Sequence, residues 1–175
     1  YGICSDKTGT LTMNQMSVMH LYVGQKLKSV GRELQDLYNR GNPAINELVR
    51  IASVCNRAIF QEPMDESLPI MARPVIGDAS DTAMLKFAEE FRHVAYMRRE
   101  YHKVVEIPFN SKNKYMLTLC RQPDDTDKRP LLMMKGAAEI MTARSSTIMM
   151  MDGKEVPLTD QIKEDLARQQ EELGE

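Results

Sequence analysis

The residues most able to do chemistry stand near the start of the chain, in residues 5–12, which read SDKTGTLT. The apolar run YGIC before them predicts a short buried strand, and the glycine and threonines after Asp6 favour a turn. Such a position places a carboxylate at the edge of an α/β sheet, where it can attack phosphorus and hold a metal ion. An ordinary Asx turn explains any one of these residues but explains the whole string poorly. Asp6 is therefore a candidate nucleophile.

Two lysines are brought together by a predicted hairpin. The alternation of residues predicts strands over 113–121 and 129–135, with a polar loop between them. Antiparallel pairing puts Lys135 roughly opposite Met116, so Lys114 and Lys135 converge at the open end of the hairpin. Two like charges on one face repel each other unless an anion lies beside them.

Neighbouring residues extend this candidate site. Gly136 exposes its backbone, and the helix predicted over 136–145 offers free N–H groups to an anion. Phe109, at the end of a strand predicted over 101–109, lies within reach and could stack on a base. This is the outline of a nucleotide site, although such patterns more often mark solvated lysines at strand ends and a phenylalanine in the core.

Asp81 lies in the first turn of a helix predicted over residues 77–91, which is capped by Asp78 or Ser80. An acid in a first turn stabilises the helix dipole by ~0.3–1 kcal/mol, which accounts for the residue without any ligand. The residues alone therefore assign no binding role to Asp81.

Composition excludes several classes of function. The 175 residues suffice for one sizeable domain, or for one domain and part of another. A net charge of −2 gives no basic field, so no nucleic-acid partner is expected. The three widely spaced cysteines lack a C-x-x-C pair and indicate reduced thiols rather than a disulfide framework or zinc site. No apolar run reaches about 18 residues, so no membrane-spanning helix is predicted.

The elements that must position these residues are predicted from pattern as well. Residues 31–42 are polar and partly turn-like, and we assign no structure to them. The clearer patterns are a hairpin over 16–30 around Gly24, a helix over 42–56 that begins at Asn42-Pro43, a loop over 61–69, a hairpin around 151–155 and a charged amphipathic C-terminal helix. Hairpin-paired strands with interspersed helices give an α+β domain with a mainly antiparallel sheet.

The string DKTGTLT, residues 6–12, resembles the phosphorylation signature of the P-type ATPases over all seven residues. Further segments resemble the nucleotide domain of that family in order and approximate spacing: CNRAIF at 55–60, GDASDTAMLKF at 77–87, VEIPFNSKNKYMLTL at 105–119 and MKGAAEIM at 134–141. Essentially the whole chain is similar to the catalytic alpha subunits of the sodium/potassium- and proton/potassium-transporting members.

The resemblance implies a division of the chain. Residues 1–16 resemble the start of the phosphorylation domain, with its motif, its hinge and a short strand of that α/β domain. Residues 17–175 resemble the nucleotide-binding domain, a mainly antiparallel twisted sheet flanked by helices, and are expected to be truncated at the C-terminal end. The family's Gly-Asp-Gly segment, Thr-Gly-Glu loop and membrane helices are missing from these residues. The chain therefore resembles a segment of a longer pump.

Catalytic roles follow from the resemblance. Asp6 matches the aspartate that accepts the γ-phosphoryl group of ATP, and Lys7 would help to neutralise that group. The Asp6 carboxylate and the main-chain carbonyl of Thr8 would hold Mg²⁺. Transfer requires in-line placement of the γ-phosphate against Asp6, which the nucleotide pocket cannot supply alone. The isolated chain is therefore expected to bind nucleotide at best, without turnover.

The resemblance also implies a nucleotide pocket. Phe109 matches the phenylalanine that stacks on adenine, and Lys114 and Lys135 match the pocket lysines. The other implied pocket residues are Ser111 and Met116 as lining residues, Gly136 beside Lys135, and Asp81 near the adenine amino group.

The chain departs from the family around this pocket. Asp81 and Met116 stand where the family has Glu and Gln, and Ala138 and Ile140 stand where it has Pro and Arg. A hydrogen bond lost at a pocket typically costs ~0.5–1.5 kcal/mol, so weakened rather than abolished nucleotide binding is expected.

For the intact pump the resemblance implies ATP and Mg²⁺ as cofactors. The implied partners are the remaining phosphorylation domain, the actuator and transmembrane domains, and a beta subunit. The implied location is the cytoplasmic face of the plasma membrane, within a multi-pass pump.

Two alternatives belong to other classes. A phosphatase of the haloacid-dehalogenase type carries a general acid–base aspartate two positions after the first one, and Thr8 stands there instead. That motif disfavours the phosphatase. A non-catalytic nucleotide-binding or interaction module with the same fold stays open because of the pocket departures.

Overall fold

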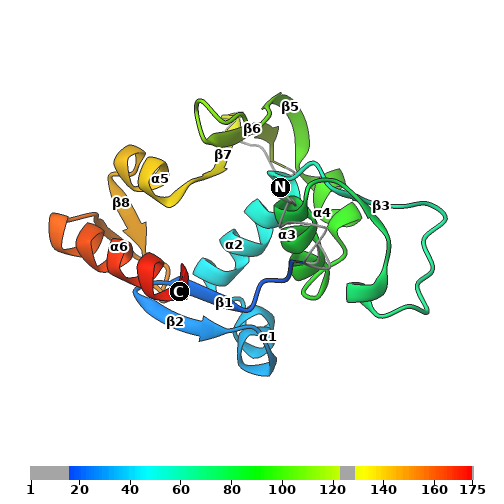
Figure 1. Ribbon diagram of the computed structural model, residues 1–175, viewed down its shortest axis with the longest axis horizontal. Helices are drawn as coiled ribbons and strands as arrows, with labels where there is room; N and C mark the ends of the chain where they lie inside the picture. Colours follow the sequence, from blue (N-terminus) through cyan, green and yellow to red (C-terminus); the bar gives the residue numbers. More distant parts are fainter. Residues whose placement is uncertain (1–15, 123–128, 175) are drawn as a thin grey trace, which may run out of the picture.

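The computed structural model describes residues 16–122 and 129–174, which form helices and antiparallel strands around a central sheet (Figure 1). In chain order the elements are β1 (His20–Val23), β2 (Lys26–Ser29), α1 (Arg32–Asn39), α2 (Pro43–Val54), β3 (Ile59–Phe60), the 3₁₀ turn η1 (Ile70–Ala72), β4 (Val75–Ile76), α3 (Ala79–Glu89), α4 (Val94–Glu100), β5 (His102–Ile107), β6 (Tyr115–Arg121), β7 (Leu131–Gly136), α5 (Ala138–Arg144), β8 (Thr147–Met149), β9 (Glu155–Pro157) and α6 (Asp160–Gly174).

The central sheet has three antiparallel strands in the order β5-β6-β7. Met116 lies opposite Lys135, which is the register expected for the hairpin. Along β6 the side chains alternate, because Met116, Thr118 and Cys120 are buried and the residues between them are half-buried. The predicted strands, their pairing and their alternation are therefore confirmed.

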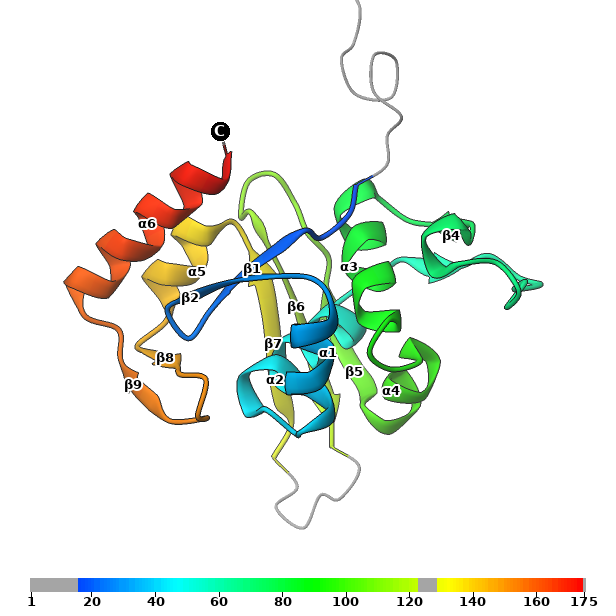
Figure 2. The same cartoon turned by 90° about the horizontal axis from the view of Figure 1, so that it is seen from below.

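Helices α2 and α4 pack against this sheet, and α3 packs against α2 and α4 (Figure 2). The side chain of Asn42 accepts a hydrogen bond from the Ile45 N–H over 3.2 Å and Pro43 opens the first turn, so α2 begins where predicted. Ile45 and Val49 are fully buried, and burying a side chain of this size stabilises a fold by ~1.5–3 kcal/mol. The core therefore lies between the helices and the sheet.

The β1–β2 hairpin confirms the prediction for residues 16–30. Val23 pairs with Lys26, and the turn between them consists of Gly24 and Gln25 with φ values of 54° and 60°. Positive φ at both central positions is the type I′ pattern, which matches the twist of the strands. Glycine adopts this conformation without strain, whereas glutamine does not.

Helix α1 lies within residues 31–42, which the sequence pattern describes as partly turn-like and to which it assigns no structure. Its inner face holds the fully buried Leu34, and Leu37 and Tyr38 pack against the core. Because the N-cap residue of α1 is Gly31, which has no side chain to cap the helix, no start signal marks α1 in the sequence. The sequence pattern does not predict α4 or the two-residue strands β3 and β4 either.

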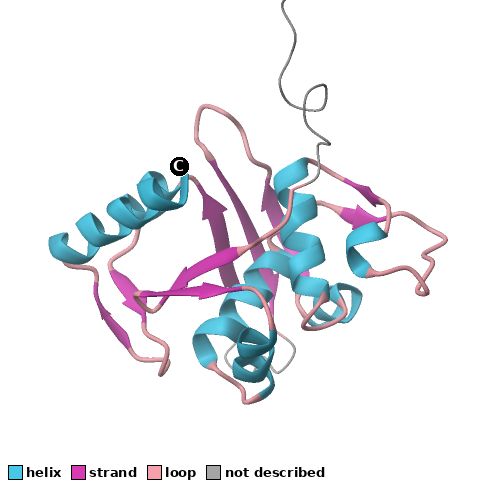
Figure 3. Ribbon diagram, turned by 60° about the horizontal axis from the view of Figure 1, so that its bottom comes forward, coloured by secondary structure: helices cyan, strands magenta, loops and turns pink. Residues whose placement is uncertain are grey.

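Strands β3 and β4 pair at one edge of the molecule, and residues 61–69 leave the core between them as the predicted loop (Figure 3). Ile59 lies opposite Ile76 and Phe60 lies opposite Val75. The pairing continues at the base of the loop, where the Gln61 N–H donates to the Pro74 carbonyl over 3.0 Å.

Every strand pair in the described ranges is antiparallel, so the predicted α+β class is confirmed. Among the helices of those ranges, none has both the length and the apolar character needed to cross a membrane. Asp6, Lys7 and Thr8 lie outside the described residues, and the domain division at residue 16 stays a prediction.

Candidate functional site

The predicted pocket residues meet at one end of the central sheet. There β5 ends, residues 108–114 turn into β6, and β7 ends at Gly136 opposite Tyr115. In Figure 2 this end is at the top of the sheet, between α5 and the start of α3. Phe109 and Lys114 therefore approach one end of the sheet from the loop between β5 and β6, and Lys135 approaches it from β7.

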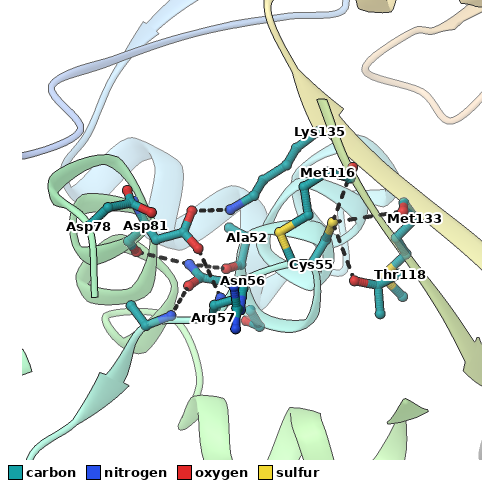
Figure 4. Close-up of polar contacts among 12 residues, drawn as sticks. Ala52, Cys55, Asn56, Arg57, Asp78, Asp81, Met116, Thr118, Met133 and Lys135 are labelled. Carbon is teal, nitrogen blue, oxygen red and sulfur yellow. Dashed lines mark hydrogen bonds and ion pairs between the residues drawn. The ribbon is translucent and has the colours of Figure 1, made fainter. Parts of the chain in front are cut away.

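Asp81 and Lys135 form an ion pair that links α3 to β7 (Figure 4). Their side chains are only 8% and 16% exposed, so water screens this pair less than a surface pair. The Asp78 side chain caps α3 by accepting from the Asp81 N–H over 2.8 Å, as predicted. Asp81 thus serves the helix start and also holds a lysine, which the sequence alone did not indicate.

The end of α2 holds Asp81 from the other side. The second carboxylate oxygen of Asp81 accepts a hydrogen bond from the Arg57 N–H over 2.9 Å. The buried side-chain amide of Asn56 donates to the Asp81 carbonyl over 2.9 Å and to the Ala52 carbonyl over 3.0 Å. Its oxygen accepts from the Ala58 N–H over 2.8 Å. Both the main chain and the carboxylate of Asp81 are therefore fixed.

Lys114 ends the turn that precedes β6. Its backbone has a φ of 57°, and its N–H donates to the Asn110 carbonyl over 2.8 Å. Its ammonium group lies 3.2 Å from a carboxylate oxygen of Glu139, and both side chains are about half exposed. A hydrogen bond from its own main-chain N–H, and then Lys114, hold the pKa of Glu139 below its usual range. Each predicted pocket lysine thus has a carboxylate partner within the chain.

Gly136 is required by the close approach of two backbones. A Cβ atom at this position would lie 2.5 Å from the Lys114 carbonyl oxygen and 2.8 Å from the Tyr115 Cβ. Ala137 then donates its N–H to the Lys114 carbonyl over 2.9 Å. Glycine therefore keeps the end of β7 tightly against the start of β6, beside Lys135.

The exposure of the other predicted residues differs. Phe109 is 58% exposed and Ser111 is also exposed. The alternative that Phe109 belongs to the core is therefore wrong. Lys114 is about half exposed, which fits the alternative of solvated lysines at strand ends, whereas Lys135 is mostly buried. Met116 is 1% exposed and belongs to the core, so its side chain does not lie on the surface of this end of the sheet.

Cys55 is fully buried to one side of the ion pair, and its sulfur points toward Thr118 and Met133 on β6 and β7 (Figure 4). Its thiol accepts from the Thr118 hydroxyl over 3.7 Å and donates to the carbonyls of Met116 and Met133. Burial raises its pKa above the ordinary value, and the Thr118 hydrogen bond opposes this only in part. A buried neutral thiol of this kind is chemically inert.

Asn56 and Arg57 are functional candidates that sequence reasoning missed. The signal was available, since this polar pair stands at the end of the helix pattern predicted over 42–56, but helix ends commonly carry polar residues. Only the structure brings the pair to Asp81.

The described residues fit a nucleotide in part. An exposed aromatic ring, two lysines and a glycine-lined backbone are the groups that bases and phosphates need. Within residues 16–122 and 129–174, no group of three His, Cys, Asp or Glu side chains is arranged to hold a metal ion. The residues implied for Mg²⁺ lie outside these ranges.

Comparison with known proteins gives a consistent result. Residues 44–175 match the family model described as P-type ATPase, cytoplasmic domain N. The chain is 46% identical to potassium-transporting ATPase alpha chain 2 of Oryctolagus cuniculus, over 98% of this chain and 16% of that protein. It is 44% identical to the same protein of Rattus norvegicus, over 89% of this chain and 15% of that protein. It is 43% identical to the sodium/potassium-transporting ATPase subunit alpha of Tetronarce californica, over 98% of this chain and 17% of that protein. The chain thus spans about one sixth of the length of these relatives.

Proposed function

The chain belongs to the P-type ATPase family, and we propose that it is the nucleotide-binding and phosphoryl-accepting segment of a cation-transporting ATPase. The observation that carries the nucleotide part is the meeting of Phe109, Lys114 and the Asp81–Lys135 pair at one end of the sheet. The exposed Phe109 ring would stack on adenine, and the lysines would bind the polar groups of the nucleotide. Asp81 would lie near the adenine amino group.

The internal ion pairs set the energetic cost of binding in this proposal. A phosphate that approaches Lys114 competes with Glu139, and because this pair is half exposed the competition is mild. Lys135 is different, because it and Asp81 are mostly buried and separating them would leave two poorly solvated charges. We therefore expect Lys135 to keep Asp81 as its partner while a nucleotide is bound.

The chemical step rests on residues outside the described ranges. Asp6 would accept the γ-phosphoryl group of ATP, Lys7 would neutralise it, and Asp6 with Thr8 would hold Mg²⁺, which would offset phosphate charge. The longer protein would add the rest of the phosphorylation domain, the actuator and transmembrane domains and a beta subunit, with this segment on the cytoplasmic face of the plasma membrane. The 175 residues alone would bind ATP without turning it over.

The first prediction is that the chain binds ATP through the Phe109 ring. Titration with ATP, followed by two-dimensional NMR, should shift signals at residues 109, 114 and 135. Phe109→Ala should weaken binding by roughly 5- to 150-fold, because base–aromatic stacking is worth ~1–3 kcal/mol. Tyr96→Ala is the control, since Tyr96 is 54% exposed and lies on α4, away from this end of the sheet.

A flat response of the whole chain at millimolar ATP would instead favour the interaction module. The observation that favours the interaction module is that Lys114 and Lys135 already have carboxylate partners within the chain. Steady ATP hydrolysis by the purified chain would contradict the expectation of binding without turnover.

A further inference from the structure

We propose that Asn56 is a positioning residue for the nucleotide site, acting through Asp81. This inference rests on the proposed function, because it assigns Asn56 a part in nucleotide binding only if Asp81 has one. Asn56 itself is 1% exposed and touches no surface that a nucleotide could reach. Its influence would be exerted entirely through the placement of Asp81.

The side chain of Asn56 uses all of its polar atoms to join three segments of the chain. Its amide group donates to the Ala52 carbonyl in the last turn of α2 and to the Asp81 carbonyl in the first turn of α3, over 3.0 and 2.9 Å. Its oxygen accepts from the Ala58 N–H, just before β3, over 2.8 Å. The amide thus replaces a helix-terminal partner at α2 and fixes the start of α3 at the same time.

The neighbouring main chain adds a further hydrogen bond to Asp81. The bond between the Asn56 oxygen and the Ala58 N–H makes a tight turn, and Arg57 lies at its centre. That turn aims the Arg57 N–H at the Asp81 carboxylate over 2.9 Å. Asn56 therefore controls Asp81 twice, directly at its carbonyl and indirectly at its carboxylate through Arg57.

Two half-buried cations hold the Asn56 main chain in turn. Its carbonyl accepts from the Arg98 guanidinium over 3.2 Å, and the Lys103 ammonium lies 3.4 Å away. With its main chain fixed, Asn56 cannot follow Asp81 if the start of α3 moves. Asp81 is consequently held at its carbonyl by the Asn56 amide, at one carboxylate oxygen by the Arg57 N–H and at the other carboxylate oxygen by Lys135.

The consequence is that loss of the Asn56 amide should displace the Asp81 carboxylate without touching the nucleotide. Removing the side chain deprives the Ala52 carbonyl and the Ala58 N–H of the hydrogen bonds that Asn56 makes to them, and it removes the bond to the Asp81 carbonyl, so stability falls as well. A stability loss alone would not distinguish a positioning role from a structural one. The distinguishing feature is that the effect on nucleotide affinity requires Asp81.

The experiment is a double-mutant cycle on the full 175-residue chain, with ATP affinity measured by NMR titration. Asn56→Ala should weaken binding by about 3- to 10-fold, comparable to one or two hydrogen bonds. In an Asp81→Ala background the same change should weaken it by less than about 2-fold, because the residues it acts through are coupled. Ser53→Ala is the matched control, since Ser53 is buried on α2 and its hydroxyl bonds the Val49 carbonyl over 2.7 Å without contacting Asp81. It should lower stability and leave ATP affinity unchanged.

Each outcome decides between the hypotheses. Equal losses of affinity in the two backgrounds, or an equal loss in Ser53→Ala, would overturn the positioning role. If the unmodified chain does not bind ATP, the proposed function fails first, and that result is read before any variant. If Asn56→Ala does not fold, Asn56→Ser takes its place in the same cycle, because its hydroxyl keeps a polar group near the Ala58 N–H but cannot reach Asp81.

Discussion

Lys114 carries its positive charge on a backbone that lysine rarely adopts. A φ of 57° costs a residue with a Cβ roughly 1–2 kcal/mol relative to the right-handed region. Strain of this kind persists where the surrounding structure or a function requires the residue. Gln25 has nearly the same φ, 60°, in the β1–β2 turn, where no binding role is proposed. The two positions form a natural comparison.

We expect Lys114→Gly to stabilise the chain and to weaken ATP binding. Glycine relieves the strain, although its greater freedom in the unfolded chain offsets part of the gain, so the free energy of unfolding should rise by roughly 0.5–1 kcal/mol. Affinity should fall because the ammonium group is lost. Gln25→Gly should raise stability by a similar amount and leave ATP affinity unchanged. Urea denaturation and ATP titration of both variants provide the measurements, and an unchanged affinity in Lys114→Gly would contradict a role for this lysine.

The limits of sequence reasoning at the residue scale are clearest at Asp81. Helix periodicity correctly predicts the cap at Asp78 and the acid in the first turn. The partner of that acid is Lys135, which lies on a strand far along the chain. Periodicity within one element carries no information about such a contact, so the ion pair could be found only in the structure.

Among the elements, α2 contributes more buried residues to the described core than any other, and it depends on how it begins. The Asn42 side chain accepts from the Ile45 N–H over 3.2 Å, and its amide donates to the Met151 carbonyl over 2.8 Å in the β8–β9 turn. One residue thus caps the helix and attaches the β8–β9 hairpin to it.

We predict that Asn42→Ala lowers the free energy of unfolding by roughly 1–2.5 kcal/mol, because both the cap and the hydrogen bond to Met151 are lost. Asn42→Asp keeps an oxygen that can cap the helix but loses the donor to Met151, so it should cost less than Asn42→Ala. Urea denaturation of the three proteins tests this order. Equal losses for the two variants would mean that the cap contributes nothing measurable.

The elements also show why the sequence predicts some helices and strands and not others. The β6–β7 register was predictable because strict alternation and a polar loop fix which residues face inward. Helix α1 was not, since it is short and polar and is held by Leu34 packing against residues far along the chain. The strands β3 and β4 have only two residues each, which is too few for a periodic pattern.

At the scale of the whole molecule, the buried thiols make the free energy of unfolding decrease at alkaline pH. Burial raises the pKa of Cys55 and Cys120 above the ordinary value of 9.0, so the folded chain keeps these protons after the unfolded chain has lost them. Stability is therefore fully present below about pH 9 and declines as the pH rises toward the folded-state values.

We expect the free energy of unfolding, measured by urea denaturation between pH 7.5 and about 10, to decline above pH 9. Cys55→Ala should be less stable throughout, because it loses a buried group, but its decline with pH should be shallower. If the two proteins decline with equal slopes, ionisation of Cys55 does not contribute and other groups must account for the loss.

The edge of the molecule formed by β3 and β4 has a consequence for how this chain can vary in length. The chain leaves the core at Ile59 and returns at Ile76, and these two residues are paired with each other. Asn56 and Arg57 then hold Asp81 just beyond the return point. Apart from the Gln61 hydrogen bond to the Pro74 carbonyl at its base, the excursion over 61–69 is closed by the pairing of residues on either side of it. Doubling the length of a flexible loop costs only about 0.6 kcal/mol of folding free energy. This excursion can therefore accommodate insertions, deletions or a whole inserted module. The end of the sheet that carries Lys135 would stay intact.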